Sequence, residues 1–256
     1  MKTNYHTHTA RCKHAEGTDE DYVLTAIKAG YTTLGFADHA PWPKHPLETQ
    51  RIRMEMDEYA DYVSSIRRLS RQYGGKIEIL LGLEAEYYPD RMDYLKALKE
   101  NTPLDYLVLG NHFHLYEAQG HYYGRFSDPK TLYKAYEESS VAALQSGLYE
   151  IFAHPDLFVR SLEEFDQEAQ AMSRRILKVA KANHVLIEFN LGGVRSGRSG
   201  LEYPFLPFWQ LVKEVGNEVI IGVDAHSPTD LIHSPSIEHA KKTLRSLGIV
   251  PVEKIK

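Results

Sequence analysis

The histidine and carboxylate residues of this chain gather where its predicted β-strands end. The sequence holds 13 histidines beside a single cysteine, Cys12. Imidazoles combined with carboxylates, without a set of cysteines, are ligands typical of zinc, manganese or iron sites. The first polar residues after the predicted strands are His6 and His8, Asp38 and His39, Glu84 and Glu86, His112 and His114, His154, Glu188 and Asn190, and Asp224 and His226.

Each of these motifs is weak evidence when it is taken alone. A pair such as His6-Thr7-His8 arises by chance in a histidine-rich chain, Asp38-His39 can cap a helix, and His154-Pro155 can form a plain turn. Chance does not readily explain why nearly every predicted strand ends in a ligand-type residue. The occurrence of these residues at nearly every strand end therefore predicts one metal-binding pocket.

Short apolar or β-branched segments predict the strands that would position these residues. They cover residues 3–6, 32–37, 77–83, 104–109, 149–153, 185–189 and 219–223. Helical patterns cover residues 18–30, 51–73, 90–99, 128–147, 162–183 and 235–247, and Thr18 and Asp128-Pro129 are typical helix starts.

The regular alternation of strands and helices predicts an α/β fold in one domain over residues 1–256, built on a parallel sheet. This many units favour a closed, TIM-like barrel over an open sheet. The carboxyl ends of the strands of such a barrel converge on one face, where the active site lies. Residues far apart in the sequence would meet there.

Composition excludes several other classes of protein. The 30 Lys and Arg residues stand against 35 Asp and Glu residues, which argues against a protein that coats nucleic acid or an anionic membrane. One cysteine excludes a disulfide framework, and no apolar run reaches the ~20 residues of a membrane span. The chain has no P-loop, and Gly192-Gly193 lacks the dinucleotide-binding spacing. We expect a cytoplasmic protein that needs neither a membrane nor a nucleic-acid partner.

The ordered motifs of the whole chain resemble the PHP (polymerase and histidinol phosphatase) family of metal-dependent phosphoesterases, and most of all its stand-alone histidinol-phosphate phosphatases. The motifs are His6-Thr7-His8 with His14, Asp38-His39, Gly82-Leu83-Glu84, Gly110-Asn111-His112-Phe113, His154-Pro155-Asp156 and Asp224-Ala225-His226. The resemblance implies a distorted (β/α)7 barrel that carries three metal ions, whether zinc, iron or manganese.

The resemblance also implies a distribution of ligands. The first ion would be held by His6, His8, Glu84 and Asp224. Glu84 would bridge to a second ion, held also by His112 and His154. The third would be held by His14, His39 and His226. Because His114 also follows Gly110, the choice between His112 and His114 is open, and we favour His112 since it precedes Phe113. His114 would then touch the substrate or stack beneath the site, and Cys12 is interpreted as a small loop residue rather than a ligand.

The implied reaction is hydrolysis of a small phosphate monoester, L-histidinol phosphate in histidine biosynthesis, by a metal-bridging hydroxide. Metals and arginines would offset the phosphoryl charge, with Arg160 and Arg195 as candidates and Arg198 as a weaker one. Each of these arginines could instead be a surface residue. Catalysis would involve Glu84, Asp224, His226 and Asp156. Asp156 would protonate the leaving alcohol or orient His154, unless it only forms a turn.

Competing interpretations stay open at this level. An amidohydrolase or a TatD-like nuclease also opens with a His-x-His motif, but would lack the trio of His14, His39 and His226. Within the family, a phosphotyrosine or nucleotide substrate is the main alternative. A non-catalytic metal-binding module is a further one, although every expected ligand position is filled. The oligomeric state cannot be deduced from the sequence.

Overall fold

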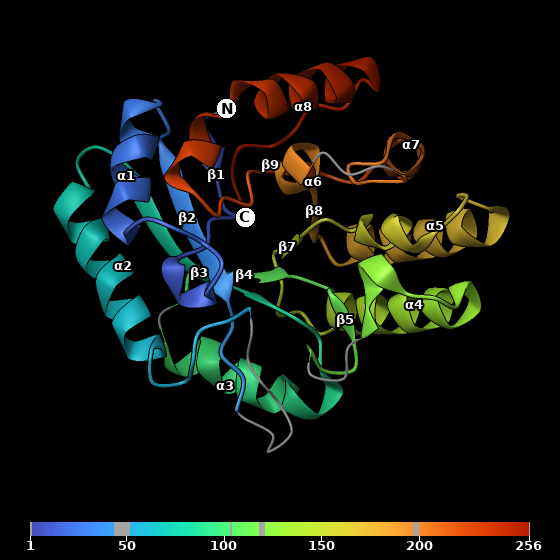
Figure 1. The fold of residues 1–256 in the computed structure, drawn as a ribbon, viewed down its shortest axis with the longest axis horizontal. Helices are drawn as coiled ribbons and strands as arrows, with labels where there is room; N and C mark the ends of the chain where they lie inside the picture. The colour runs from blue at the N-terminus through green and yellow to red at the C-terminus, as the bar shows by residue number, and fades with distance from the viewer. Residues whose placement is uncertain (1, 44–51, 103, 118–120, 197–199, 256) are drawn as a thin grey trace.

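The computed structural model describes residues 2–43, 52–102, 104–117, 121–196 and 200–255. Its centre is a parallel seven-stranded sheet in the order β1-β2-β3-β4-β7-β8-β9. Figure 1 shows these strands in the middle of the molecule with the helices arranged around them. The strands are β1 (Thr3–Asn4), β2 (Thr33–His39), β3 (Glu78–Ala85), β4 (Tyr106–Leu109), β7 (Ile151–Phe152), β8 (Leu186–Asn190) and β9 (Val219–Gly222).

The sheet closes almost completely on itself, which confirms the predicted α/β barrel. Thr7, beyond β1, forms an isolated parallel bridge with Ala225, beyond β9. The side chain of Asn4 completes this seam, because its Oδ1 accepts a hydrogen bond from the backbone N of Val223 at 2.8 Å. Its Nδ2 donates to the carbonyl of His6 at 3.0 Å. A side-chain amide thus pairs with the backbone N of Val223, which a regular strand ladder would otherwise satisfy, while the carbonyl of His6 also accepts from Ala225 N across the seam.

Helices between the strands confirm the predicted alternation. Thr18 forms a capping box with Asp21, and Asp128 caps the helix that begins at Pro129, as the sequence predicts. Helices α6 and α7 and the antiparallel pair β5 (Phe113–His114) and β6 (His121–Tyr122) were not predicted. The helices are α1 (Asp19–Lys28), α2 (Tyr59–Tyr73), α3 (Met92–Asn101), α4 (Pro129–Gln145), α5 (Gln167–Ala182), α6 (Leu191–Ser196), α7 (Leu206–Val215) and α8 (Ser234–Ser246).

The helices predicted over residues 51–73 and 162–183 both begin later than expected, the second at Gln167 after its cap Asp166. The polar pattern predicts a helix from residue 51, whereas α2 begins at Tyr59. Residues 52–58 are irregular because Arg53 turns inward, where it is buried and forms an ion pair with Glu86. A buried ion pair outweighs the helical preference of the segment.

The interior of the barrel is apolar at the end opposite the histidines. Tyr5, Tyr106, Val108 and Ile151 belong to one buried cluster, against which Val252 of the C-terminal segment packs. The hydroxyl of Tyr106 donates to the carbonyl of Tyr5 at 2.6 Å, so its buried polar atom is satisfied. This end of the barrel stabilises the fold and leaves the opposite end for chemistry. Among the described residues, no helix is both long and apolar enough to cross a membrane.

Candidate metal centre

The carboxyl ends of the strands bring together the histidines and carboxylates predicted as ligands. Glu84 lies within β3 and His39 is the last residue of β2. The others follow the ends of β1, β4, β7 and β9 by a few residues, except His14, which lies beyond the 3-10 turn Ala10–Cys12. Alternation along an extended chain points His6 and His8 to the same face. The predicted ligands that meet at this end of the barrel, although they lie far apart in the sequence, are His6, His8, His14, His39, Glu84, His112, His154, Asp224 and His226.

Glu84 lies at the centre of this group. Its Oε2 is 3.1 Å from His39 Nδ1 and 3.5 Å from His6 Nε2. Its Oε1 is 3.1 Å from His154 Nε2 and 3.4 Å from His112 Nε2. The two oxygens of one carboxylate therefore face two different sets of imidazoles, which is the arrangement that a carboxylate bridging two ions requires.

Gly110 makes room for this central carboxylate. A Cβ atom at position 110 would clash with Glu84 Oε1 and with the ring of His112. Glycine is therefore required where β4 leaves the sheet beside the site.

Asp224 completes the group on the side of the seam. Its Oδ1 is 3.2 Å from His8 Nε2 and 3.6 Å from His6 Nε2, and these two ring nitrogens lie 3.1 Å apart. Asp224 adopts a left-handed backbone conformation with φ of 53°, as does His154 with φ of 32°. Non-glycine residues rarely adopt such values, and strain of this kind is concentrated at functional sites.

Three further carboxylates fix the inner histidine rings through their second nitrogen. His6 Nδ1 lies 2.8 Å from Glu188 Oε1, and His112 Nδ1 lies 3.1 Å from Glu86 Oε1. His8 Nδ1 lies 3.4 Å from Asp38 Oδ1. Metal-binding histidines generally have such a partner, which sets the tautomer and the orientation of the ring. Sequence reasoning noted these acids at strand ends but assigned them no role.

Glu86 is in turn held by a buried cation. Arg53 Nη2 and Nη1 donate to its two oxygens at 2.9 and 3.0 Å, and the indole of Trp42 donates to it at 3.2 Å. Burial raises the pKa of Glu86, but Arg53 and His112 lower it to about 2. Glu86 therefore stays ionised beside His112.

The outer histidines form their Nδ1 contacts chiefly with backbone oxygens, although Asp224 Oδ1 also lies 3.4 Å from His226 Nδ1. His14 Nδ1 lies 2.8 Å from the carbonyl of Cys12, and His226 Nδ1 lies 3.2 Å from the carbonyl of Asp224. The Nε2 atoms of His14 and His226 lie 2.9 Å apart. Both rings therefore direct their free nitrogens to a common point.

The charges and unpaired atoms of the site fit bound cations. The carboxylates of Asp38, Glu84, Glu86, Glu188 and Asp224 are all buried here, and burying an ionised group without a partner is costly. Among the described buried residues, Arg53 is the permanent cation, and it pairs with Glu86. The Nδ1 atom of His39 is buried beside Glu84 Oε2 without forming a hydrogen bond. Metal ions would balance the acids and satisfy this nitrogen.

The protonation preferences of the imidazoles differ across the site. Burial lowers the pKa of His6, but Glu188, Asp224 and Glu84 raise it well above the usual value. Burial holds the pKa of His39 well below the usual value. Burial and the neighbouring His8 lower the pKa of His226 to about 3. His39 and His226 are therefore neutral, which is the form that binds metal.

Two other predicted site residues, Arg195 and Asp156, form hydrogen bonds with neighbouring parts of the protein. Arg195 donates to the carbonyls of Val223 and Asp224 at 2.8 and 2.7 Å and pairs with Asp230, so it supports the backbone at Asp224. Asp156 Oδ2 accepts hydrogen bonds from Phe205 N at 2.7 Å and Trp209 Nε1 at 3.0 Å. Burial raises the pKa of Asp156 to about 7.

Arg160 lies closer to the metal centre than sequence position alone reveals. Its guanidinium pairs with Glu202 and stacks 4.3 Å from the centre of the Tyr203 ring. That ring lies 5.7 Å from the ring of His154. Arg160 is thus one aromatic ring away from a predicted ligand. Arg198, the weaker candidate, lies outside the described residues.

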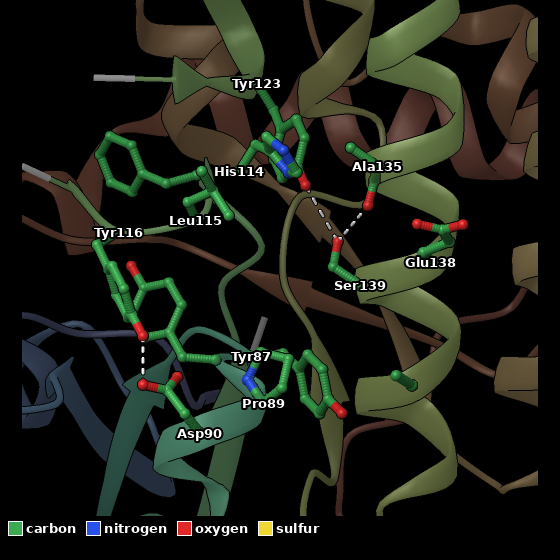
Figure 2. A pocket seen from close by; sticks show the side chains of 13 residues that line it. Tyr87, Pro89, Asp90, His114, Leu115, Tyr116, Tyr123, Ala135, Glu138 and Ser139 are labelled. Atoms are coloured by element: carbon green, nitrogen blue, oxygen red, sulfur yellow. Dashed lines mark hydrogen bonds between the residues drawn. The ribbon is translucent and has the colours of Figure 1, made fainter. Parts of the chain in front are cut away.

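His112 and His114 point to different surroundings. His112 faces Glu84, whereas His114 on β5 lines a separate pocket of about 430 Å³. Figure 2 shows His114 beside Tyr123 in this pocket, with Tyr87, Pro89 and Tyr116 among the other walls. The geometry thus favours His112 over His114 as the residue at the metal centre.

Comparison with known proteins gives a consistent result. A family model, the PHP domain, matches residues 4–192. The chain is 27% identical over 249 residues to the "probable histidinol-phosphatase" of Deinococcus radiodurans, covering 95% of this chain and 92% of that protein. It is 24% identical over 262 residues to the histidinol-phosphatase of Bacillus subtilis, covering 90% and 96%.

A solved structure also resembles this one. Histidinol phosphate phosphatase from Lactococcus lactis, in complex with zinc, L-histidinol and phosphate, matches with a TM-score of 0.77. The match covers 100% of this chain and 98% of that one at 17% sequence identity. At this identity the likeness establishes a common fold.

Proposed function

Since the chain belongs to the PHP domain family, we propose that it is a metal-dependent phosphatase that hydrolyses histidinol phosphate to histidinol and phosphate. The observation that carries this proposal is the position of Glu84, whose two oxygens face two sets of imidazoles. The relatives that match this chain over nearly their whole length are named histidinol-phosphatases, which supports histidinol phosphate as the substrate.

The ligands would be divided over three ions. The first would be held by His6, His8, Glu84 and Asp224, the second by Glu84, His112 and His154, and the third by His14, His39 and His226. Zinc, iron and manganese all suit such donors. Ions bound here would supply a Lewis acid that activates water and offsets the charge of the phosphate.

The protein's own residues would orient these ligands and the substrate. Glu188, Glu86 and Asp38 hold the inner rings by their Nδ1 atoms, and Arg195 holds the backbone of Asp224. Arg160 is our candidate for contact with the phosphate, because its guanidinium lies beside Tyr203 at the side of His154.

Asp156 is better placed as a positioning residue than as the proton donor to the leaving alcohol. It holds Phe205 and Trp209. Its carboxylate thereby supports the segment that carries Tyr203, the ring between Arg160 and His154.

We further propose that residues 1–256 act as one catalytic domain in the cytoplasm. The family model ends at residue 192, but β9 and the residues that follow it supply Asp224 and His226. The matched part would therefore lack ligands of two of the proposed ions.

Phosphate release from a panel of monoesters tests the proposal. The panel contains L-histidinol phosphate, a phosphotyrosine peptide, a mononucleotide and an oligonucleotide, each given to the metal-loaded protein. We expect clear preference for L-histidinol phosphate and loss of that activity with a chelator. A preference for the phosphotyrosine peptide or for either nucleotide substrate would replace the substrate that we propose. Failure to release phosphate from any monoester, with metal bound, would overturn the phosphatase itself.

A further inference from the structure

Three neighbours hold the guanidinium of Arg160 in one orientation. Its Nε donates to Glu202 Oε1, and its Nη1 donates to the hydroxyl of Tyr122 at 3.2 Å. Its central carbon lies 4.3 Å from the centre of the Tyr203 ring. Within the part of the chain that the structure describes, the remaining nitrogen, Nη2, forms no hydrogen bond. Nη2 is therefore the donor that this fixed guanidinium can offer to a ligand.

Glu202 is itself fixed by the protein around it. Its Oε1 also accepts a hydrogen bond from the backbone N of Tyr203 at 3.0 Å, and its Oε2 accepts one from Ser196 Oγ at 3.0 Å. Ser196 ends α6, and the side chain of Glu202 is only 17% exposed. Both oxygens of the carboxylate are thus held, so that Glu202 gives Arg160 a partner of fixed position.

The segment that carries Glu202 is held on two sides. A Cβ atom at position 193 would lie 1.9 Å from the carbonyl oxygen of Tyr203, so only glycine lets α6 approach this closely. On the other side, the backbone N of Phe205 donates to Asp156 Oδ2 at 2.7 Å. Asp156 follows the predicted ligand His154 by two residues. The segment is therefore anchored beside the metal centre, and it carries the partner of Arg160 with it.

A guanidinium held in this way suits a phosphate group. Burial lowers the pKa of Arg160, but Glu202 and Tyr203 raise it above its usual value, so the side chain stays charged. Donors that are already oriented need no rearrangement when an anion arrives. A long side chain that becomes ordered only on binding costs affinity instead.

We propose that Glu202 is a positioning residue for phosphate binding, because it orients the guanidinium of Arg160 at the side of His154. The inference rests on the contact between Arg160 and phosphate proposed above. Glu202 acts through Arg160, and its charged hydrogen bond contributes more than the neutral one from Tyr122.

Binding of inorganic phosphate to the metal-loaded protein tests this role without turnover. We expect Glu202→Ala to weaken binding by about 10-fold in titration calorimetry, the effect of releasing one long side chain. Glu202→Gln keeps an oxygen acceptor for Nε and should bind phosphate within about 3-fold of the wild type. In an Arg160→Ala background, Glu202→Ala should have no further effect, because nothing is left to position.

Glu214 offers a matched control. It forms the same kind of pair with Arg174, with an Nη2–Oε2 distance of 3.1 Å, but at the surface. Glu214→Ala should therefore leave phosphate binding unchanged, and metal content should equal that of the wild type in every variant.

The outcomes separate this inference from the proposed function. Phosphate binding by Glu202→Ala that is as tight as in the wild type, or tighter, would overturn the positioning role and leave the phosphatase standing. An equal loss in the Arg160→Ala background would also overturn it, since the effect would not pass through Arg160. If the wild type binds phosphate but releases none from any monoester, the proposed function fails and the affinities still decide this inference. A metal-loaded wild type that binds no phosphate would overturn both.

A second variant keeps the test decisive if Glu202→Ala fails to fold. Tyr122→Phe removes the hydroxyl that accepts from Arg160 Nη1. We expect it to weaken phosphate binding by about 3-fold, and only while Arg160 is present. An unchanged affinity would overturn the idea that the protein presets this guanidinium.

Discussion

The inner and outer halves of the metal centre are built from the same residue type but supported differently. The inner histidines, His6, His8 and His112, have carboxylates at their second nitrogens. The outer histidines, His14 and His226, form hydrogen bonds with backbone carbonyls there, and the Asp224 carboxylate lies 3.4 Å from His226 Nδ1 as well. A carboxylate fixes the ring and also raises its basicity, whereas a carbonyl fixes the ring with less effect on charge. The inner rings are thus surrounded by more negative charge than the outer rings.

Removal of the residue shared by both sets of inner imidazoles should have the largest effect. We expect Glu84→Ala to lose the inner metal ions that this carboxylate would hold and to lower kcat by roughly 1,000-fold or more. This decrease is larger than the one expected when a single electrostatic contact to the transition state is removed. Metal content and phosphate release measure this effect. Glu78→Ala, at the exposed start of the same strand, is the matched control and should keep both. Full activity in Glu84→Ala would rule out the bridging role.

Removal of an outer ligand should have a smaller and more local effect. We expect His14→Ala to lose one ion per chain while the inner ions remain, because the inner carboxylates do not contact His14. Activity should fall by about 100-fold, the size of one electrostatic contribution to a transition state. Metal analysis and kinetics on one sample measure both quantities. Loss of every ion from His14→Ala would show that the two halves are not separable.

Neutralisation of an inner carboxylate should have the smallest effect. Glu188→Gln keeps the shape of the side chain and a hydrogen-bond acceptor for His6, but it removes the charge. We expect metal affinity to fall by about 10–100-fold, with activity restored at saturating metal. Competition with a metal indicator measures this affinity. An unchanged affinity would mean that Glu188 only positions the ring, as the carbonyls do in the outer half.

Most of the barrel and the identity of the residues gathered at its end could be predicted from the sequence. Apolar runs mark each strand, and the polar residues that follow must converge when the strands are parallel. The supporting contacts could not be predicted, because strand-end position does not show which ring nitrogen meets Glu188 or Glu86. The burial of Arg53, which delays the start of α2, depends on the distant Glu86. Likewise, the hairpin that turns His114 away depends on pairing between β5 and β6.

The narrow seam beside Asn4 has a consequence for how the protein holds its shape. One isolated bridge and one amide side chain join the two ends of the sheet over the described residues. His6 and His8 come from one edge of that seam and Asp224 from the other. An ion held by these three residues would connect the first strand to the last. Metal binding and closure of the barrel would then be thermodynamically linked, so that the metal contributes to folding as well as to chemistry.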